Sequence, residues 1–531
     1  MPIIKAERAS VETLLGAWFK ECTPKILVVT DSLNFLNNDG FGLTEFVATL
    51  RASTIHGMTP QVTTAKVNPD PALAPSFDPD TDHISNYKFT DPTYGVSIVH
   101  YDVVFMFAGN KRAEHPLLTD EAGALTAVSA FMRAGGGLFA TGDHEDLGAG
   151  MCQEIPRVRS MRHWTEGTPS VDKADRHSTL LPGRGDQCDS NDTYEFSDQQ
   201  DRFPQRLFVN YRTEAGRTQG DPLVKFAHPL LQVPGEARAI EVSPDHIHEG
   251  KCIVTPNIEL TLAGGEREWP LDGDGSGRPV LPEMVALSMA HGNGVTTPGG
   301  ERPAVIPRSF IAIAAYDGQL SSVGRVVTDA SYHHFANANI QPPKVRLGKR
   351  DLRDIKQYYT NLASWLMPKK TRRCLRAPAL IQELLRDPLF EEFPPTPITK
   401  LDGARARELG VLVEGALLAG YSRAEVDTLM NDALEDAIGP SAKHQLETLD
   451  GEFGGIPARS AALAALGAFT LATAERFNSL ASEPFASEGA LDGEAAFADT
   501  GKEATASVQL YLASARNQLG KLQGLLGAIA G

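Results

Sequence analysis

The sequence from Ala130 to Gly150 is AFMRAGGGLFATGDHEDLGAG. Three glycines end a helical pattern, and the apolar run Leu138–Ala140 that follows has the character of a buried strand. The run then breaks at Gly142 into Asp143, His144 and Glu145. Because ligands bind at the carboxyl ends of strands in open α/β sheets, this order predicts a site for acid–base chemistry. The alternative is a solvated acidic turn at the start of a helix, where carboxylates are favoured.

Further apolar runs of strand length flank this stretch. They lie at 25–31 (KILVVTD), 101–107 (YDVVFMF), 310–316 (FIAIAAY) and 325–329 (RVVTD). Helical spacing of apolar residues at 41–52 and 119–133 separates the first three strands. This alternation predicts an α/β fold with a mostly parallel sheet covered on both faces. Residues 355–366 are predicted to close the unit as a helix, and the Pro-, Asp- and Thr-rich stretch 68–92 to form a surface loop.

The composition divides the 531 residues into several parts. The predicted parts are an N-terminal helix (1–23), an α/β domain (24–368) with an irregular insertion at about 151–210, a linker (369–400) and a helical C-terminal domain (401–531). Pro394 and Pro397 favour a stiff linker. The last part is rich in Ala and Leu, and its Ser422–Glu425 capping box opens one helix. Its alanines are expected to let helix backbones approach closely.

Charge and cysteine usage narrow the class of protein. The net charge of −17 argues against binding to nucleic acid or to an anionic membrane surface. Five cysteines without CxxC spacing predict a reducing compartment and no disulfide framework. The N-terminus has no apolar signal-peptide core, and no stretch is apolar enough to span a membrane. These features favour a cytoplasmic protein.

Polar side chains follow four of the predicted strands. They are Asp31 and Asn34 after the first strand, Asp143, His144 and Glu145 after the third, His246 and His248 after a strand at 239–242, and Asp329, His333 and His334 after the last. Because the ends of parallel strands share one edge of a sheet, we expect these groups to face one crevice. The candidate catalytic residues there are Asp143, His144, Glu145 and Asp31.

The histidines suggest a metal site. His246 and His248 point the same way on an extended segment, because the side-chain period of a strand is two. Adjacent His333 and His334 would point apart, so at most one of them is expected to face the crevice. Three imidazoles or carboxylates could hold zinc or another divalent ion and leave one position open for water. The alternative is a structural histidine pair without a metal.

The insertion supplies candidate substrate-binding residues. With Asn34 and Asp329, the set is Arg157, Arg162, His163 and His177. The arginines could bind an anionic substrate bidentately, although a solvated, salt-bridged face is the simpler interpretation. Cys152 is a further candidate nucleophile, with His163 or His177 as its base. Against that, a cysteine usually behaves as a small buried hydrophobe.

The order of these features resembles the class I glutamine amidotransferase-like superfamily, in its trehalose-utilisation-type branch. The resemblance rests on Lys25–Thr30, Tyr101–Val104, Phe131–Leu138, Ala227–Leu230, Gly324–Val327 and Tyr358–Trp365, and covers residues 24–368. It implies a flavodoxin-like three-layer sandwich. His144 and His333 or His334 are similar in placement to histidines of that branch. The family's nucleophilic cysteine is absent from Thr141–Glu145, so the resemblance does not carry glutaminase chemistry.

Two classes of function follow. The first is a hydrolase that acts on a small polar substrate, such as a sugar derivative or an amide, with water activated by a carboxylate–imidazole pair or by a metal. The second is a catalytically silent amidotransferase-like protein that binds a ligand or assembles through its helical tail, with itself or with a protein partner.

Overall fold

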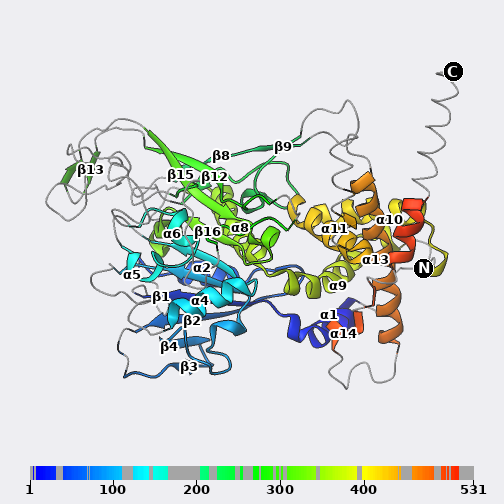
Figure 1. Ribbon diagram of the computed structural model, residues 1–531, viewed down its shortest axis with the longest axis horizontal. Helices are drawn as coiled ribbons and strands as arrows, with labels where there is room; N and C mark the ends of the chain where they lie inside the picture. The colour runs from blue at the N-terminus through cyan, green and yellow to red at the C-terminus, as the bar shows by residue number, and fades with distance from the viewer. Residues whose placement is uncertain are drawn as a thin grey trace.

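A computed structural model gives the fold of the chain (Figure 1). It describes residues 4, 8–31, 40–68, 70, 72–110, 123–142, 147–164, 204–214, 224–244, 252–254, 267–273, 277–290, 295–297, 300–302, 308–341, 347–391, 397–439, 442–443, 446, 457–482, 492–497, 499–500 and 504–513. The sheet and the C-terminal helices form two neighbouring lobes in Figure 1, with α9 between them.

The described residues form a ten-stranded sheet of order β3-β4-β2-β1-β5-β6-β16-β15-β12-β8. Its strands are β1 (Lys25–Thr30), β2 (Gln61–Val67), β3 (Ser76–Asp78), β4 (His83–Tyr87), β5 (Val103–Phe107), β6 (Gly137–Thr141), β8 (Phe208–Val209), β12 (Glu283–Ala290), β15 (Arg308–Tyr316) and β16 (Val326–Asp329). The six strands from β4 to β16 are parallel, and β3, β15, β12 and β8 pair antiparallel. The prediction of an α/β fold with a mostly parallel sheet is confirmed.

Burial explains why the central strands have few polar residues. Every residue of β5 and β6 is buried, as the composition of a parallel strand covered on both faces requires. The chain passes from β1 through α2 (Thr44–Arg51) to β2 in one direction, and from β5 through α4 (Ala124–Arg133) to β6 in the other. Right-handed crossovers therefore place α2 and α4 on opposite faces. Helix α8 (Lys349–Leu366) packs against α2, β6 and β16.

The outer strands differ from the expectation. Part of the stretch 68–92, predicted to be a surface loop, forms β3 and β4 and extends the sheet. Strands β2 and β12 were not predicted. In β2 the polar Thr63 and Thr64 are buried beside β1 and β4, which hid the strand from a hydrophobicity pattern. The antiparallel pairing of β15 with β16 shows that the parallel order ends there.

Shorter elements complete this lobe. They are η2 (Ile98–His100), α5 (Ala149–Cys152), α6 (Val158–Met161), β7 (Gln205–Arg206), β9 (Arg212–Glu214), β10 (Val224–Phe226), η4 (Pro229–Leu231), β11 (Val242–Ser243), β13 (Val295–Thr297), β14 (Gly300–Arg302), η5 (Gly318–Ser321), η6 (Tyr332–His334) and α7 (Asn337–Ile340). The expected irregular insertion at 151–210 begins with α5 and α6, and most of the rest of it lies outside the described residues.

The second lobe is helical, as predicted. Its elements are α1 (Arg8–Trp18), η1 (Lys20–Cys22), α9 (Lys369–Arg386), η7 (Pro388–Glu391), η8 (Ile398–Lys400), α10 (Gly403–Gly420), α11 (Arg423–Ile438), α13 (Pro457–Ala481) and α14 (Gly493–Phe497). Much of the stretch 369–400, expected to be a linker, is the helix α9. Leu375, Leu380 and Ile381 of α9 are buried in the same core as α10 and α13. The N-terminal α1 joins this core through Val11 and Leu15.

Two cysteines far apart in the sequence are bonded in this lobe. Cys22 at the end of η1 and Cys374 in α9 form a disulfide, with their Cα atoms 5.7 Å apart. The prediction of no disulfide framework is therefore wrong for this pair. The sequence separation of 352 positions explains why cysteine spacing gave no signal. No helix in the described part of the chain is both long and apolar enough to cross a bilayer.

Candidate functional site

A buried carboxylate–imidazole pair lies at the carboxyl end of β16. Asp329 ends the strand, and Ser331 caps the short helix η6 that carries His334. The Asp329 Oδ1 atom lies 2.6 Å from His334 Nδ1. Both side chains are buried, with 0% of Asp329 and 1% of His334 exposed. This short contact is a hydrogen bond between two buried side chains, and it joins the end of β16 to η6.

The remaining contacts of Asp329 fix its orientation. The hydroxyl of Tyr358 on α8 donates to Asp329 Oδ2 at 2.9 Å, and the Ser331 N–H donates to Oδ1 at 3.2 Å. Burial, reinforced by the Asp329 charge, raises the pKa of Tyr358 well above its ordinary value, so the phenol stays protonated and donates. These donors leave Asp329 in one rotamer, facing the imidazole.

The second nitrogen of His334 is unpaired. We assign the proton to Nδ1, because Asp329 is an acceptor, and this leaves a lone pair on Nε2. The Nε2 atom is buried and has no hydrogen-bond partner among the described residues. The backbone of His334 is also fixed, since its carbonyl accepts the Tyr359 hydroxyl at 2.5 Å. A buried nitrogen without a hydrogen-bond partner costs about 1–3 kcal/mol.

His333 is placed differently from His334. Its half-buried ring lies edge-on to Phe41, with ring centroids 5.9 Å apart, and against Tyr332 at 4.6 Å. Its backbone N–H donates to the Ser331 hydroxyl. The two neighbouring histidines therefore have separate environments, and only His334 bonds to Asp329.

Asp31 lies at the same edge of the sheet, directly after β1. Its two carboxylate oxygens accept the backbone N–H groups of Gly109, at 2.8 Å, and Asn110, at 3.2 Å. The Asn110 side chain donates in return to the Asp31 carbonyl. These bonds join the ends of β1 and β5. The structure thus places Asp31, Asp329 and His334 at the carboxyl edge and gives Asp31 a strand-joining role.

Strand β6 also ends at the carboxyl edge, beside η6. The carbonyl of Gly142, directly after β6, accepts the backbone N–H of Tyr332 at 2.9 Å. The sequence then continues into the candidate residues Asp143, His144 and Glu145, which lie outside the described residues. The candidates Asn34, His177, His246 and His248 lie outside them as well.

The described contacts of the candidate arginines are with other residues of the protein. Arg162 is fully buried, and its guanidinium donates to the carbonyls of Asp329 at 3.1 Å and Ala330 at 2.8 Å. It also donates to the carbonyl of the buried His163 and lies 4.5 Å from the Trp164 ring. Arg162 therefore holds the β16 end in place.

Arg157 lies away from this edge. Its guanidinium sits 5.3 Å from the ring centre of Tyr316, at the end of β15 that pairs with the start of β16. Its backbone N–H donates to the buried Glu268 at 2.6 Å. Arg157 thus lies near the start of β16, whereas Asp329 ends that strand.

Neither described free thiol has the environment of a nucleophile. Cys152 and Cys252 are buried. Burial raises the pKa of Cys152 well above its ordinary value and that of Cys252 to about 12. Both therefore stay protonated near neutral pH, which disfavours Cys152 as a nucleophile.

The donor set gives no metal centre among the described residues, where no group of three or more His, Cys, Asp or Glu could hold an ion. His334 offers one imidazole nitrogen, since Nδ1 is committed to Asp329. A zinc site needs at least three protein ligands.

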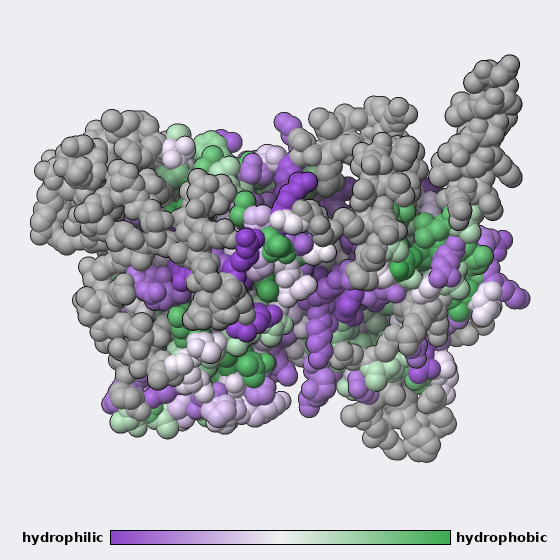
Figure 2. All heavy atoms as spheres, in the orientation of Figure 1, coloured by the Kyte–Doolittle hydropathy of each residue, from purple (hydrophilic) through white to green (hydrophobic). Residues whose placement is uncertain are grey.

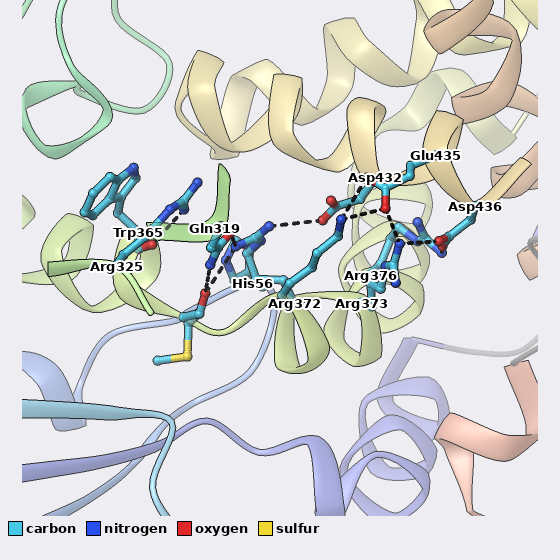
Figure 3. Close-up of polar contacts among 12 residues, drawn as sticks. His56, Gln319, Arg325, Trp365, Arg372, Arg373, Arg376, Asp432, Glu435 and Asp436 are labelled. Carbon is cyan, nitrogen blue, oxygen red and sulfur yellow. Dashed lines mark hydrogen bonds and ion pairs between the residues drawn. The ribbon is translucent and has the colours of Figure 1, made fainter. Parts of the chain in front are cut away.

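The sequence interpretation missed a buried ionic network between the two lobes (Figure 3). Arg372 on α9 donates to Gln319 at 2.6 Å and pairs with Asp432 of α11 at 3.3 Å. Burial, together with the nearby Arg325, lowers the pKa of Arg372 to about 10. The sequence contains a basic segment at 369–373 and an acidic segment at 432–436. No local pattern shows that these two segments contact each other. Figure 2 shows hydrophilic surface between the lobes.

Further pairs extend this network. Lys369 binds Glu435 at 2.7 Å, and Arg376 binds Asp436 at 2.6 Å. The Arg376 guanidinium also lies 3.9 Å from the ring centre of Phe469 in α13. Helix α9 therefore contacts the helical core with its apolar side and α11 with its charged side.

Protonation of His228 is expected to destabilise the fold. His228 is 2% exposed, and its Nδ1 accepts the Leu230 N–H at 3.2 Å. Burial lowers the pKa of His228, against the opposing effect of Glu283. Below about pH 6.5 the unfolded chain therefore binds a proton that the folded chain does not, and stability falls by up to about 1.4 kcal/mol per pH unit.

Urea unfolding at pH 7.5 and pH 5.5 measures this effect. His228→Asn keeps an acceptor for Leu230 but cannot titrate, so the variant should lose less stability than the wild type between the two pH values. Equal losses in both proteins would contradict this role of His228.

The site thus consists of an oriented Asp329–His334 pair beside the ends of β1, β5 and β6. The chain was also compared with known proteins. No protein-family model, curated protein or solved structure matches it.

Proposed function

We propose that the protein is a hydrolase in which His334 is the general base and Asp329 orients it. The observation that carries the proposal is the buried Asp329–His334 pair, whose Nε2 atom has no hydrogen-bond partner in the described part of the chain. The substrate class is a small polar molecule, such as a sugar derivative or an amide. Residues 24–368 would form a flavodoxin-like, amidotransferase-like unit. The six parallel strands, in the order β4-β2-β1-β5-β6-β16, follow the chain order 3-2-1-4-5-6, which supports a doubly wound sheet, and the flavodoxin-like order 2-1-3-4-5 is obtained only for the five strands without β4.

The reaction follows from the protonation states. The lone pair on His334 Nε2 accepts a proton from water as the water attacks the substrate carbon. The imidazolium that forms is stabilised by the Asp329 carboxylate through the Nδ1–H bond, and Tyr358 and Ser331 keep that carboxylate in place. The imidazolium then returns the proton to the leaving group. Asp143 and Glu145, which follow Gly142 in the chain, are the candidates for binding or proton transfer on the substrate side.

Substitution of each histidine tests the assignment. The purified protein is assayed against a panel of chromogenic esters, amides and glycosides, and the best substrate is retested with His334→Ala and His333→Ala. Loss of a general base predicts a fall in kcat of about 10²–10⁴-fold for His334→Ala. The His333→Ala variant, with its ring outside the pair, should keep most of the activity.

The alternative outcomes are distinct. Equal activity in both variants would remove His334 from the mechanism. A protein that hydrolyses none of the panel but binds a polar ligand would match the silent ligand-binding function instead.

A further inference from the structure

The disulfide lies on the wall of a pocket at the opposite edge of the sheet. Cys22 and Cys374 both line a space of about 550 Å³, together with Lys25, Asp102 and Lys370. Lys25 begins β1 and Asp102 directly precedes β5, so this is the amino edge, away from Asp329. A space of this size matches the pockets that hold small ligands.

Cys22 and Cys374 differ in solvent exposure. Cys22 is 4% exposed, whereas Cys374 is half-buried. A thiolate in the pocket would therefore reach Cys374 first and leave Cys22 as the departing sulfur. The other described cysteines, Cys152 and Cys252, are enclosed in the α/β core. They are internal controls for any thiol reagent.

The pocket wall carries charges of both signs. Lys25 and Lys370 contribute to it, and so do Glu21 and Asp102. Both carboxylate oxygens of Asp102 already accept hydrogen bonds from the protein. The donors are the Thr371 hydroxyl at 2.5 Å and the Lys25 backbone N–H at 2.8 Å. Burial raises the pKa of Asp102. Cations near a sulfur stabilise its thiolate.

We propose that Cys22–Cys374 is a thiol–disulfide exchange site for an anionic low-molecular-weight thiol of the glutathione class. The thiolate attacks Cys374 Sγ, the S–S bond breaks, and Cys22 leaves as a thiolate that takes up a proton. A second thiol then attacks the mixed disulfide at the small-molecule sulfur. The products are the small-molecule disulfide and two protein thiols, so two electrons pass from two thiols to the protein.

The exchange would change how the N-terminus is held. The disulfide ties η1 to α9, and noncovalent packing supports the same segment. Trp18 packs on Phe477 with ring centroids 5.5 Å apart, and Phe19 packs on Phe497 at 5.4 Å. Reduction should therefore leave the protein folded while it lowers the thermal stability of the helical lobe, because the closed loop no longer restricts the unfolded chain.

Peptide-resolved alkylation of the full-length protein tests the proposal. The protein is first oxidised with glutathione disulfide and then treated with millimolar reduced glutathione at neutral pH, and each cysteine is quantified by mass spectrometry. We expect Cys22 and Cys374 to become alkylated together in the folded protein, while Cys152 and Cys252 stay unmodified. Reduction that occurs only in denaturant, or cysteines that glutathione disulfide fails to join, would overturn the proposal.

Single variants test the direction of attack and the role of charge. With glutathione disulfide, Cys22→Ser should trap a mixed disulfide on Cys374, whereas Cys374→Ser should leave Cys22 largely unmodified. Lys370→Gln should slow reduction by glutathione several-fold and slow reduction by 2-mercaptoethanol by less, because the 2-mercaptoethanol thiolate has no carboxylates. Equal trapping in both cysteine variants would refute the order of attack, and equal slowing with both thiols would refute the selection for an anion.

Discussion

Replacing Asp329 by Asn is expected to lower hydrolytic turnover by about 10³- to 10⁴-fold with little change in fold. The side chains have nearly the same shape. The amide oxygen can still accept the Ser331 N–H and His334 Nδ1–H, and the amide nitrogen can donate to the Tyr358 hydroxyl. What is lost is the negative charge that stabilises the imidazolium when Nε2 takes up a proton.

The measurement is kcat for the wild type and for Asp329→Asn, with circular dichroism spectra to check that the fold is unchanged. Tyr358→Phe is the matched control, since it removes one donor to Asp329 and keeps the charge. Its turnover should fall by no more than about 10-fold. Wild-type turnover in Asp329→Asn would rule out the proposed role of the pair.

Replacing Gly410 by Ala is expected to destabilise the helical lobe by about 3 kcal/mol or more, at the upper end of overpacking effects. Gly410 lies where α10 crosses α13. A Cβ atom there would come within 1.8 Å of the Leu463 carbonyl oxygen, and one on Gly467 would come within 2.0 Å of the Ala406 oxygen. Both obstacles are backbone atoms, so the helices would have to separate. The sequence predicted a close approach from its alanines, and the close approach described here is at two glycines, Gly410 and Gly467.

Gly415 in the same helix provides the control. Around a Cβ atom at Gly415, no atom of the described residues lies within 4 Å. Gly415→Ala should therefore stabilise the protein by about 0.5–1 kcal/mol, through helix propensity alone. Urea unfolding followed by the fluorescence of Trp18, which packs on α13, compares the two variants. Similar midpoints for Gly410→Ala and Gly415→Ala would contradict the close crossing.

Local sequence patterns predicted the central strands but not the outer ones. β1, β5 and β6 are short apolar runs between helical patterns, and their burial on both faces makes that composition necessary. β2 is hidden because Thr63 and Thr64 are buried only through their neighbours in the sheet. The basic run at the start of α9 was interpreted as the end of a helix. Its acidic partners lie about 60 residues further along the chain, so the local sequence did not indicate the ion pairs.

The sequence by itself determined which residues end the strands. It therefore placed Asp31, Asp329 and His334 at one edge, because strand length and side-chain period are encoded in adjacent residues. Only the tertiary structure decided how these groups are paired. Tyr358 reaches Asp329 across 29 positions, and Cys22 reaches Cys374 across 352. Such contacts form when packing brings distant segments together, and no local periodicity records which side chains will meet.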